Sequence, residues 1–141
     1  MQYKVWIGGS CDYGHKERAG GAAVVIEHNC KIISKEVIAD LYTTEFRMML
    51  TLMVKVMDEL PEQSDIVFLT NVAYIQNFDK EPNEKSANPD LIRQCIEAEK
   101  QHQSVIVKIV PYHKSPKLIE THDMASEAMN KTRKEYHHDR K

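Results

Sequence analysis

The chain has 141 residues, of which 42% are hydrophobic and 28% charged, and its formal net charge is −2. This length suits one domain that buries a sizeable core, and the composition is ordinary for a soluble globular protein. No apolar run approaches the about 20 residues that span a bilayer, and the N-terminus has no signal-peptide pattern. We therefore expect a cytoplasmic protein with no membrane partner. The charge argues against strong, indiscriminate binding to nucleic-acid phosphates.

The three cysteines are scattered along the sequence and odd in number, which does not suit a disulfide framework or a metal cluster. They are expected to be free thiols in a reducing compartment. They are Cys11, Cys30 and Cys95.

Three strand-like segments joined by short links open the chain. Residues 3–7 are rich in β-branched and aromatic side chains, and Gly8-Gly9-Ser10 is expected to break this strand. A second strand is predicted over 22–27 and a third over 31–38. The pair His28-Asn29 between them fits a tight turn, because asparagine tolerates positive φ. The pattern predicts an antiparallel meander.

A change to helical spacing follows, with apolar residues recurring from Phe46 to Leu60. Thr43 or Thr44 can cap this helix, and Glu45 is favourable in its first turn. Pro61 ends it. The sequence therefore predicts one amphipathic helix after the meander.

The second half of the chain begins with Asp65 and four consecutive apolar residues, which is typical of a strand buried on both faces of a parallel sheet. A short helix is predicted over 72–78 and a charged loop over 79–87. Asn88 as cap and Pro89 at the first helical position predict a helix that ends near residue 101. Residues 104–110 form the fifth predicted strand.

The end of the chain is predicted as a helix that opens at Pro116. From Lys131 the sequence is polar and net basic, and it is expected to fray. We therefore predict one domain over residues 1–130 and a C-terminal tail over 131–141.

Several segments, in this order, resemble segments of the ribonuclease H family. VWIGGS at residues 5–10 is similar to the family's first strand and its D-G-S turn, and TTEFRMML at 43–50 is similar to T-T-N-N-R-M-E-L. LTNVAYI at 69–75 resembles T-D-S-x-Y-V, and VPYH at 110–113 resembles V-K-G-H. The resemblance covers roughly residues 5–129. It implies an α/β fold with a five-stranded mixed sheet, in strand order 3-2-1-4-5, flanked by helices.

The family cleaves the RNA strand of an RNA–DNA hybrid with two divalent metal ions held by four carboxylates. The resemblance places Gly8, Met49, Asn71 and Asp123 at these four positions, the last by its spacing of ten residues from His113. Glycine offers no ligand, a thioether suits Mg²⁺ poorly, and an amide lacks the charge. The sequence therefore predicts that the two-metal site is lost and that no cofactor is needed. Only a weak metal site at Asp123 remains.

The resemblance leaves three functions open. The first is a catalytically inactive protein that binds an RNA–DNA hybrid or RNA, with candidate contacts near the former catalytic groove. These are Ser10, Thr44, Glu45, Arg47, Asn71, Tyr74 and His113.

The second function is a protein-interaction or scaffold module that recognises a protein partner. The third is a surviving hybrid nuclease, dependent on Mg²⁺ or Mn²⁺, in which the relocated acids Glu45, Asp12 and Asp123 converge. In any of the three, Met49→Glu is expected to destabilise the chain unless a cation is added.

Overall fold

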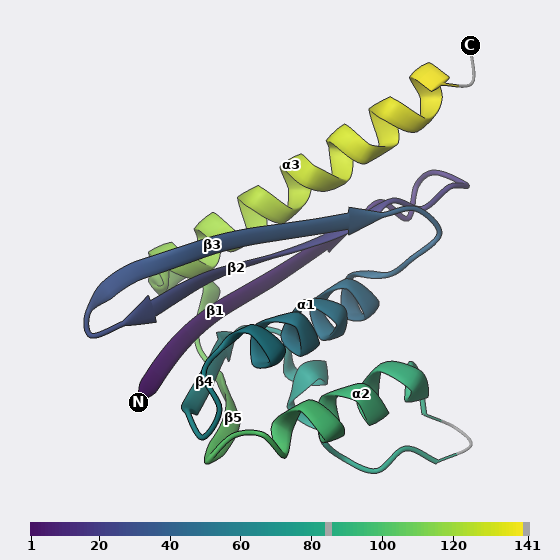
Figure 1. Cartoon of the computed structure of the whole chain (residues 1–141). Coiled ribbons are helices and arrows are strands. Elements are labelled where there is room, and N and C mark those ends of the chain that lie inside the picture. Colours follow the sequence, from purple (N-terminus) through teal and green to yellow (C-terminus); the bar gives the residue numbers. More distant parts are fainter. Residues whose placement is uncertain (84–85, 140–141) are drawn as a thin grey trace.

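The computed structural model describes residues 1–83 and 86–139, with side chains as far as Tyr136. Its sheet has the strand order β3-β2-β1-β4-β5, so the predicted fold class is confirmed (Figure 1). The first three strands are antiparallel, and β4 and β5 run parallel to β1. The strands are β1 Gln2–Cys11, β2 Gly20–His28, β3 Lys31–Asp40, β4 Asp65–Thr70 and β5 Ser104–Ile109.

Helices lie on both faces of this sheet. Helices α1 and α2 pack together on one face, and α3 crosses β1, β2 and β3 on the other (Figure 1). Most of the core lies between α1 and the sheet, where seven helical side chains are buried. The helices are α1 Glu45–Glu59, α2 Pro89–Glu99 and α3 Pro116–Asp139, with short 3-10 helices η1 Ala73–Asn77 and η2 Tyr112–Lys114.

Strand β1 is longer than predicted, because Gly8-Gly9-Ser10 does not break it. Gly8 pairs with Ala23, and the antiparallel ladder continues through Ser10 to Cys11. No described glycine has a positive φ, so these glycines are present for another reason than a turn. Pairing with β2 has overridden the low strand propensity of glycine.

The β2–β3 turn is confirmed one residue further along than predicted. His28 pairs with Lys31, so the two turn residues are Asn29 and Cys30, with φ values of 52° and 63°. Two successive positive φ values define a type I′ turn, whose twist matches that of the flanking strands.

Helix α1 begins as the sequence predicts. Thr44 is the N-cap, and its Oγ1 accepts a hydrogen bond of 3.1 Å from the Arg47 backbone N–H. Glu45 occupies the first turn, and the helix ends before Leu60. The cap fixes where the helix starts and so places Glu45 beside the end of β1.

Helix α2 begins at Pro89 as predicted, but Asn88 does not cap it with its side chain. Asn88 is in the left-handed region at φ 56°, and its Oδ1 accepts a hydrogen bond from Arg47 instead. Because the amide oxygen of Asn88 accepts from the guanidinium of Arg47 on α1, it does not accept from the backbone N–H groups at the start of α2. The predicted N-cap position is confirmed, but the side-chain hydrogen bond expected of a capping asparagine is not formed.

Helix α3 extends further than predicted. The chain was expected to fray from Lys131, yet the helix continues to Asp139, while Arg140 and Lys141 lie outside the described residues. Arg133 contributes to this, because its guanidinium forms an ion pair with Asp12 at the end of β1.

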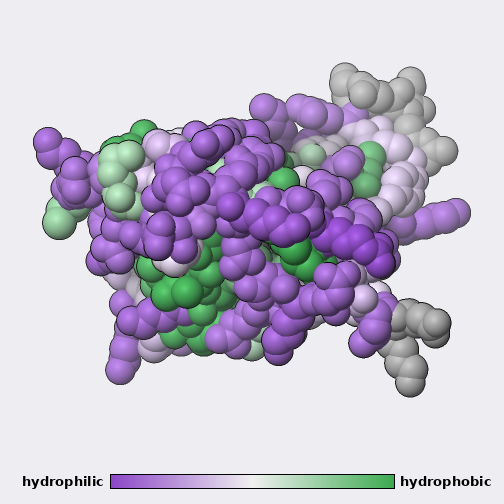
Figure 2. Space-filling model, turned by 60° about the horizontal axis from the view of Figure 1, so that its bottom comes forward, coloured by the Kyte–Doolittle hydropathy of each residue, from purple (hydrophilic) through white to green (hydrophobic). Residues whose placement is uncertain are grey.

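None of the helices among the described residues combines the length and the apolar character needed to cross a bilayer. The face that Figure 2 brings forward is mostly hydrophilic, and hydrophobic side chains show through it in a few patches. Scattered exposed apolar side chains are normal at a protein surface.

The C-terminal end of α2 carries a carboxyl group that resists ionisation. Burial raises the pKa of Glu99 to about 7, and the neighbouring Asp79 carboxyl adds to this by repulsion and hydrogen bonding. The pKa is thus higher in the folded chain than the about 4.3 of an ordinary glutamate. The resulting stabilisation is full below about pH 4 and is lost as the pH rises through about 7.

We expect Glu99→Gln to remove this pH dependence. The unfolding free energy should then differ less between about pH 5 and about pH 8 than in the parent, by about 1 kcal/mol after allowance for solvent screening. Urea titrations at the two pH values measure the difference. Glu97→Gln, exposed on the same helix, is the matched control and should leave it unchanged. An unchanged pH dependence in Glu99→Gln would contradict the assignment.

Candidate functional site

A cavity of about 190 Å³ lies where β1 and β4 end, between the N-terminus of α1 and the first turns of α3. This is the place at which the resemblance puts the family's catalytic groove. Polar and backbone groups dominate its wall. It is lined by Gly8, Gly9, Glu45, Asn71, Val72, Tyr112, Leu118 and His122.

Gly8 leaves no room for a side chain on its α3 side. A Cβ atom there would lie 2.6 Å from Thr121 Oγ1 and 3.2 Å from the His122 backbone nitrogen. Thr121 is fully buried, and its hydroxyl donates to the Leu118 carbonyl at 2.6 Å, so it is not free to turn away. Gly8 therefore serves the close approach of α3 to β1.

Met49 lies in the core and not on the cavity wall. Its side chain is fully buried. Its Sδ would be 3.0 Å from a Cβ atom at Gly9, so the thioether covers the backbone of β1 from the α1 side. The two glycines thus let α3 and α1 approach the same strand from opposite faces.

The structure places Asp123 outside the set of residues that line the cavity. Its side chain is 75% exposed and lines a surface groove with Pro116, Lys117 and Glu120. His122 lines the cavity instead. One residue along a helix turns the side chain by about 100°, so His122 and Asp123 face different directions, and the correspondence of Asp123 to the family's last acid stays a prediction.

The rotation of α3 could have been read from its buried stripe. Leu118, Thr121, Ala125 and Met129 are buried at spacings of three and four, and they fix which side of the helix faces the sheet. His122 lies at the border of that stripe, and Asp123 lies beyond it. Sequence reasoning also missed Tyr112, whose ring packs edge-on against His122 at a centroid distance of 5.8 Å.

Glu45 is the one carboxylate among the residues that line the cavity. Partial burial raises the pKa of this carboxyl, and the nearby His122 works in the opposite direction. Asp12 does not join it, because Asp12 is held by Arg133 and by the His15 Nδ1 at 2.7 Å. The relocated acids of the third hypothesis therefore do not converge.

The donor set does not fit the two-metal centre that the resemblance implies. The wall supplies one carboxylate and the Asn71 amide, whereas two divalent ions need several anionic oxygens to offset their mutual repulsion. Over residues 1–83 and 86–139, no group of three or more His, Cys, Asp or Glu side chains is arranged to hold a metal. The Asp123 carboxylate is not among the groups that line the cavity, although its Oδ1 lies 3.9 Å from Nδ1 of His122, which is.

The candidate nucleic-acid contacts divide into two sets. Glu45 and Asn71 line the cavity, and His113 is exposed beside it, its ring 5.3 Å from that of Tyr112. Ser10 Oγ instead accepts a hydrogen bond of 3.1 Å from Ser126 on α3, and Thr44 caps α1. The side chains of this second set therefore stabilise the fold: Ser10 joins β1 to α3, and Thr44 caps α1.

Arg47 and Tyr74 also belong to that second set. The Arg47 guanidinium donates to both carboxylate oxygens of Asp90, at 3.2 and 2.9 Å. The same guanidinium beside Asp90 lowers the pKa of that carboxyl. The Tyr74 hydroxyl donates to the Ala87 carbonyl, and its ring packs on Phe46 at 4.6 Å. Both side chains attach the start of α2 to α1.

Comparison with known proteins places the fold. No family model matches the sequence, and no curated protein matches it. The crystal structure of LC9-RNase H1, a type 1 RNase H with the type 2 active-site motif, superposes with a TM-score of 0.77. That protein is 19% identical in sequence, and the match covers 93% of this chain and 73% of that one. The chain therefore has the α/β fold of type 1 ribonuclease H, with its five-stranded mixed sheet in the order β3-β2-β1-β4-β5.

Proposed function

We propose that this chain binds nucleic acid, an RNA–DNA hybrid or RNA, across the cavity and does not cleave it. The observation that carries the proposal is the composition of the cavity wall. His122 and Asn71 line the cavity, and Glu45 is the one carboxylate among the described residues that do so. Such a wall suits a phosphate better than a pair of divalent cations.

The surroundings of the cavity support an anionic ligand. Tyr112, which lines the cavity, packs edge-on against both His113 and His122, so two imidazoles lie beside this ring. Lys114 is exposed on the same short helix η2. Asn71, exposed at the end of β4, offers amide donors and an acceptor for a sugar hydroxyl. Shape and 2′-hydroxyl contacts are how double-stranded RNA is recognised in general.

We expect Lys114→Ala and His122→Ala each to weaken binding of a fluorescein-labelled RNA–DNA hybrid by about three- to tenfold. The reason is the loss of a cationic or hydrogen-bonding partner for phosphate. Lys114→Ala should also reduce the dependence of log affinity on log salt by about one unit. Fluorescence anisotropy titrations at several salt concentrations measure both. Lys100→Ala, at an exposed residue that follows α2 and does not line the cavity, is the control and should bind like the parent.

The same duplex tests whether the chain cleaves. Incubation with Mg²⁺ or Mn²⁺ should leave the labelled RNA strand intact on a denaturing gel. Cleavage that disappears in Glu45→Gln would overturn the inactive assignment, because Glu45 is the acid of the cavity. Absence of binding to the hybrid, to RNA and to DNA would overturn the nucleic-acid assignment itself.

A further inference from the structure

Strand β3 forms a free edge of the sheet over ten residues. Among the described strands it pairs only with β2, so alternate backbone N–H and C=O groups along its outer side have no strand partner. It also carries three of the large apolar side chains that are exposed: Ile32 at 42%, Ile33 at 52% and Val37 at 46%. A long edge with exposed apolar side chains is a template for pairing with another strand.

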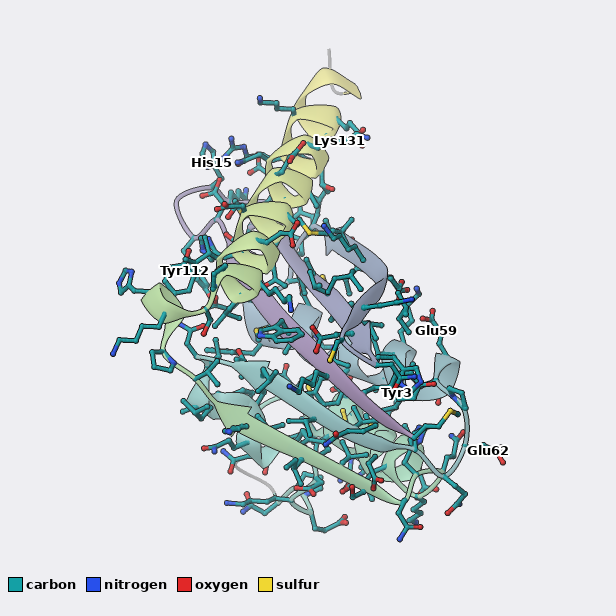
Figure 3. All side chains as sticks on the ribbon, turned by 90° about the vertical axis from the view of Figure 1, so that its left-hand side faces the viewer. Tyr3, His15, Glu59, Glu62, Tyr112 and Lys131 are labelled. Atoms are coloured by element: carbon teal, nitrogen blue, oxygen red, sulfur yellow. The ribbon has the colours of Figure 1, made fainter. Side chains whose placement is uncertain are left out.

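A groove runs beside this edge, between β3 and α3. It has a volume of about 280 Å³, and Val37 forms its β3 side. Its α3 side is formed by Met124, Glu127, Ala128 and Lys131. Figure 3 labels Lys131 on the second half of α3, above the sheet. The apolar side chains of the groove, Val37, Met124 and Ala128, are thus accompanied by one acid, Glu127, and one base, Lys131, both from α3.

The outward stripe of α3 has its charges segregated along the helix. Spacings of three and four residues place the charged side chains on one side. The first half carries acids and the second half bases, in the order Glu120, Asp123, Glu127, Lys131 and Lys134. Glu127, Lys131 and Lys134 form no ion pair within the part of the chain that the structure describes. A second copy of this helix, laid antiparallel, would place its bases opposite these acids.

We propose that two copies of this chain pair through their β3 edges, with the two α3 helices antiparallel, about a two-fold axis beside Val37. The axis is normal to the sheet, so opposed residues must lie on the same face. Centring it on Lys35 or Glu36 would put like charges directly opposite, which is destabilising. Centring it on Val37 puts valine against valine.

One axis serves both elements. Val37 and Lys131 line the same groove, so an axis through the centre of β3 also passes near the middle of the α3 stripe. Glu127 then faces Lys131 of the second copy, and Lys131 faces its Glu127. A self-complementary patch of this kind is what a two-fold interface requires. The interface lies on the opposite edge of the sheet from β5 and leaves the cavity open.

Disulfide trapping tests the register. In an antiparallel pair, directly opposed Cα atoms are about 4.5–5.5 Å apart, which is within disulfide range. Val37→Cys, in a Cys30→Ser background that removes an exposed thiol, should form a disulfide-linked dimer on mild oxidation. Ile106→Cys in the same background is the matched control, because Ile106 is 54% exposed but lies on β5. Equal cross-linking of the two variants would overturn the proposal.

Reversing the charges of Lys131 and Glu127 tests the contact between the two α3 helices. Sedimentation equilibrium of the parent chain should show a mass that rises with concentration toward twice that of one chain. Lys131→Glu should raise the dissociation constant at least about tenfold, since it faces Glu127 of the second copy. Adding Glu127→Lys should bring it back to within about threefold of the parent. A parent that stays monomeric at all concentrations, or a double variant that dimerises no better than Lys131→Glu, would overturn the proposal. Circular dichroism confirms that each variant is folded.

Discussion

Replacing Gly8 by aspartate should lower the free energy of unfolding by about 3 kcal/mol or more, from overpacking and from burial of a carboxylate. The reason is the 2.6 Å separation between Thr121 Oγ1 and a Cβ atom at Gly8. Thr121 cannot yield without breaking its bond to the Leu118 carbonyl, and the His122 backbone closes the same space at 3.2 Å. Urea unfolding followed by circular dichroism measures the loss.

Two further variants separate the clash from other effects. Gly8→Ala tests the clash without the charge and should lower the free energy of unfolding by about 1–3 kcal/mol. Adding Thr121→Ala should restore part of that free energy, because the two side chains would occupy the same space. Gly14→Ala is the matched control. A Cβ there would lie 3.4 Å from Asp12 Oδ1, an ordinary contact in an exposed loop, so its effect should be small. A Gly8→Asp chain as stable as the parent would show that α3 can withdraw from β1.

The crowding at Gly8 bears on whether the family's acids could be introduced at this cavity. Thr121 of α3 occupies the space that a side chain at Gly8 would need. Substituting Gly8→Asp, Met49→Glu and Asn71→Asp together is therefore expected to give no cleavage, because Gly8 has no room for a side chain and residue 49 is fully buried in the core.

The resemblance to the ribonuclease H family was sufficient to predict the sheet order, and local signals predicted the start of α1. The turn at Asn29, the cap at Thr44 and the apolar run after Asp65 are local signals that tertiary contacts reinforce. Where local and tertiary signals disagreed, the local reading failed. Gly8-Gly9-Ser10 has the composition of a turn, but cross-strand pairing with β2 keeps it extended.

The candidate site was harder to predict, because it depends on which way α3 is rotated. Spacing from His113 pointed to Asp123, but the buried stripe through Leu118 and Ala125 turns His122 toward the cavity. Arg47 shows the same limit. Its place near the expected groove made it a candidate contact for nucleic acid, whereas the structure shows that its guanidinium is paired with Asp90. Side-chain partners that are distant in sequence carry no local signal.

The second large effect is expected for Met49→Glu, which should lower the free energy of unfolding by about 3–5 kcal/mol because it buries an uncompensated charge. Met49 is fully buried, and Glu45, one turn earlier, would add repulsion. The sequence alone suggested that a cation would relieve this cost. In the structure the side chain packs over the Gly9 backbone, and neither Asp12 nor Asp123 lines the cavity wall where a shared ion would sit.

Thermal unfolding of Met49→Glu with and without millimolar Mg²⁺ decides between these expectations. The midpoint of the variant should stay within about 1 °C on adding Mg²⁺, since a ligand stabilises only by binding the folded state. Met49→Gln separates the charge from the polarity, and Met49→Leu conserves the volume and should cost less than about 1.5 kcal/mol. A rise of the midpoint with Mg²⁺ in Met49→Glu that Met49→Gln does not show would mean that the cavity still gathers ligands for a divalent ion. It would then be the charge of the wall, and not the packing of α3 on β1, that separates this chain from a metal-dependent nuclease.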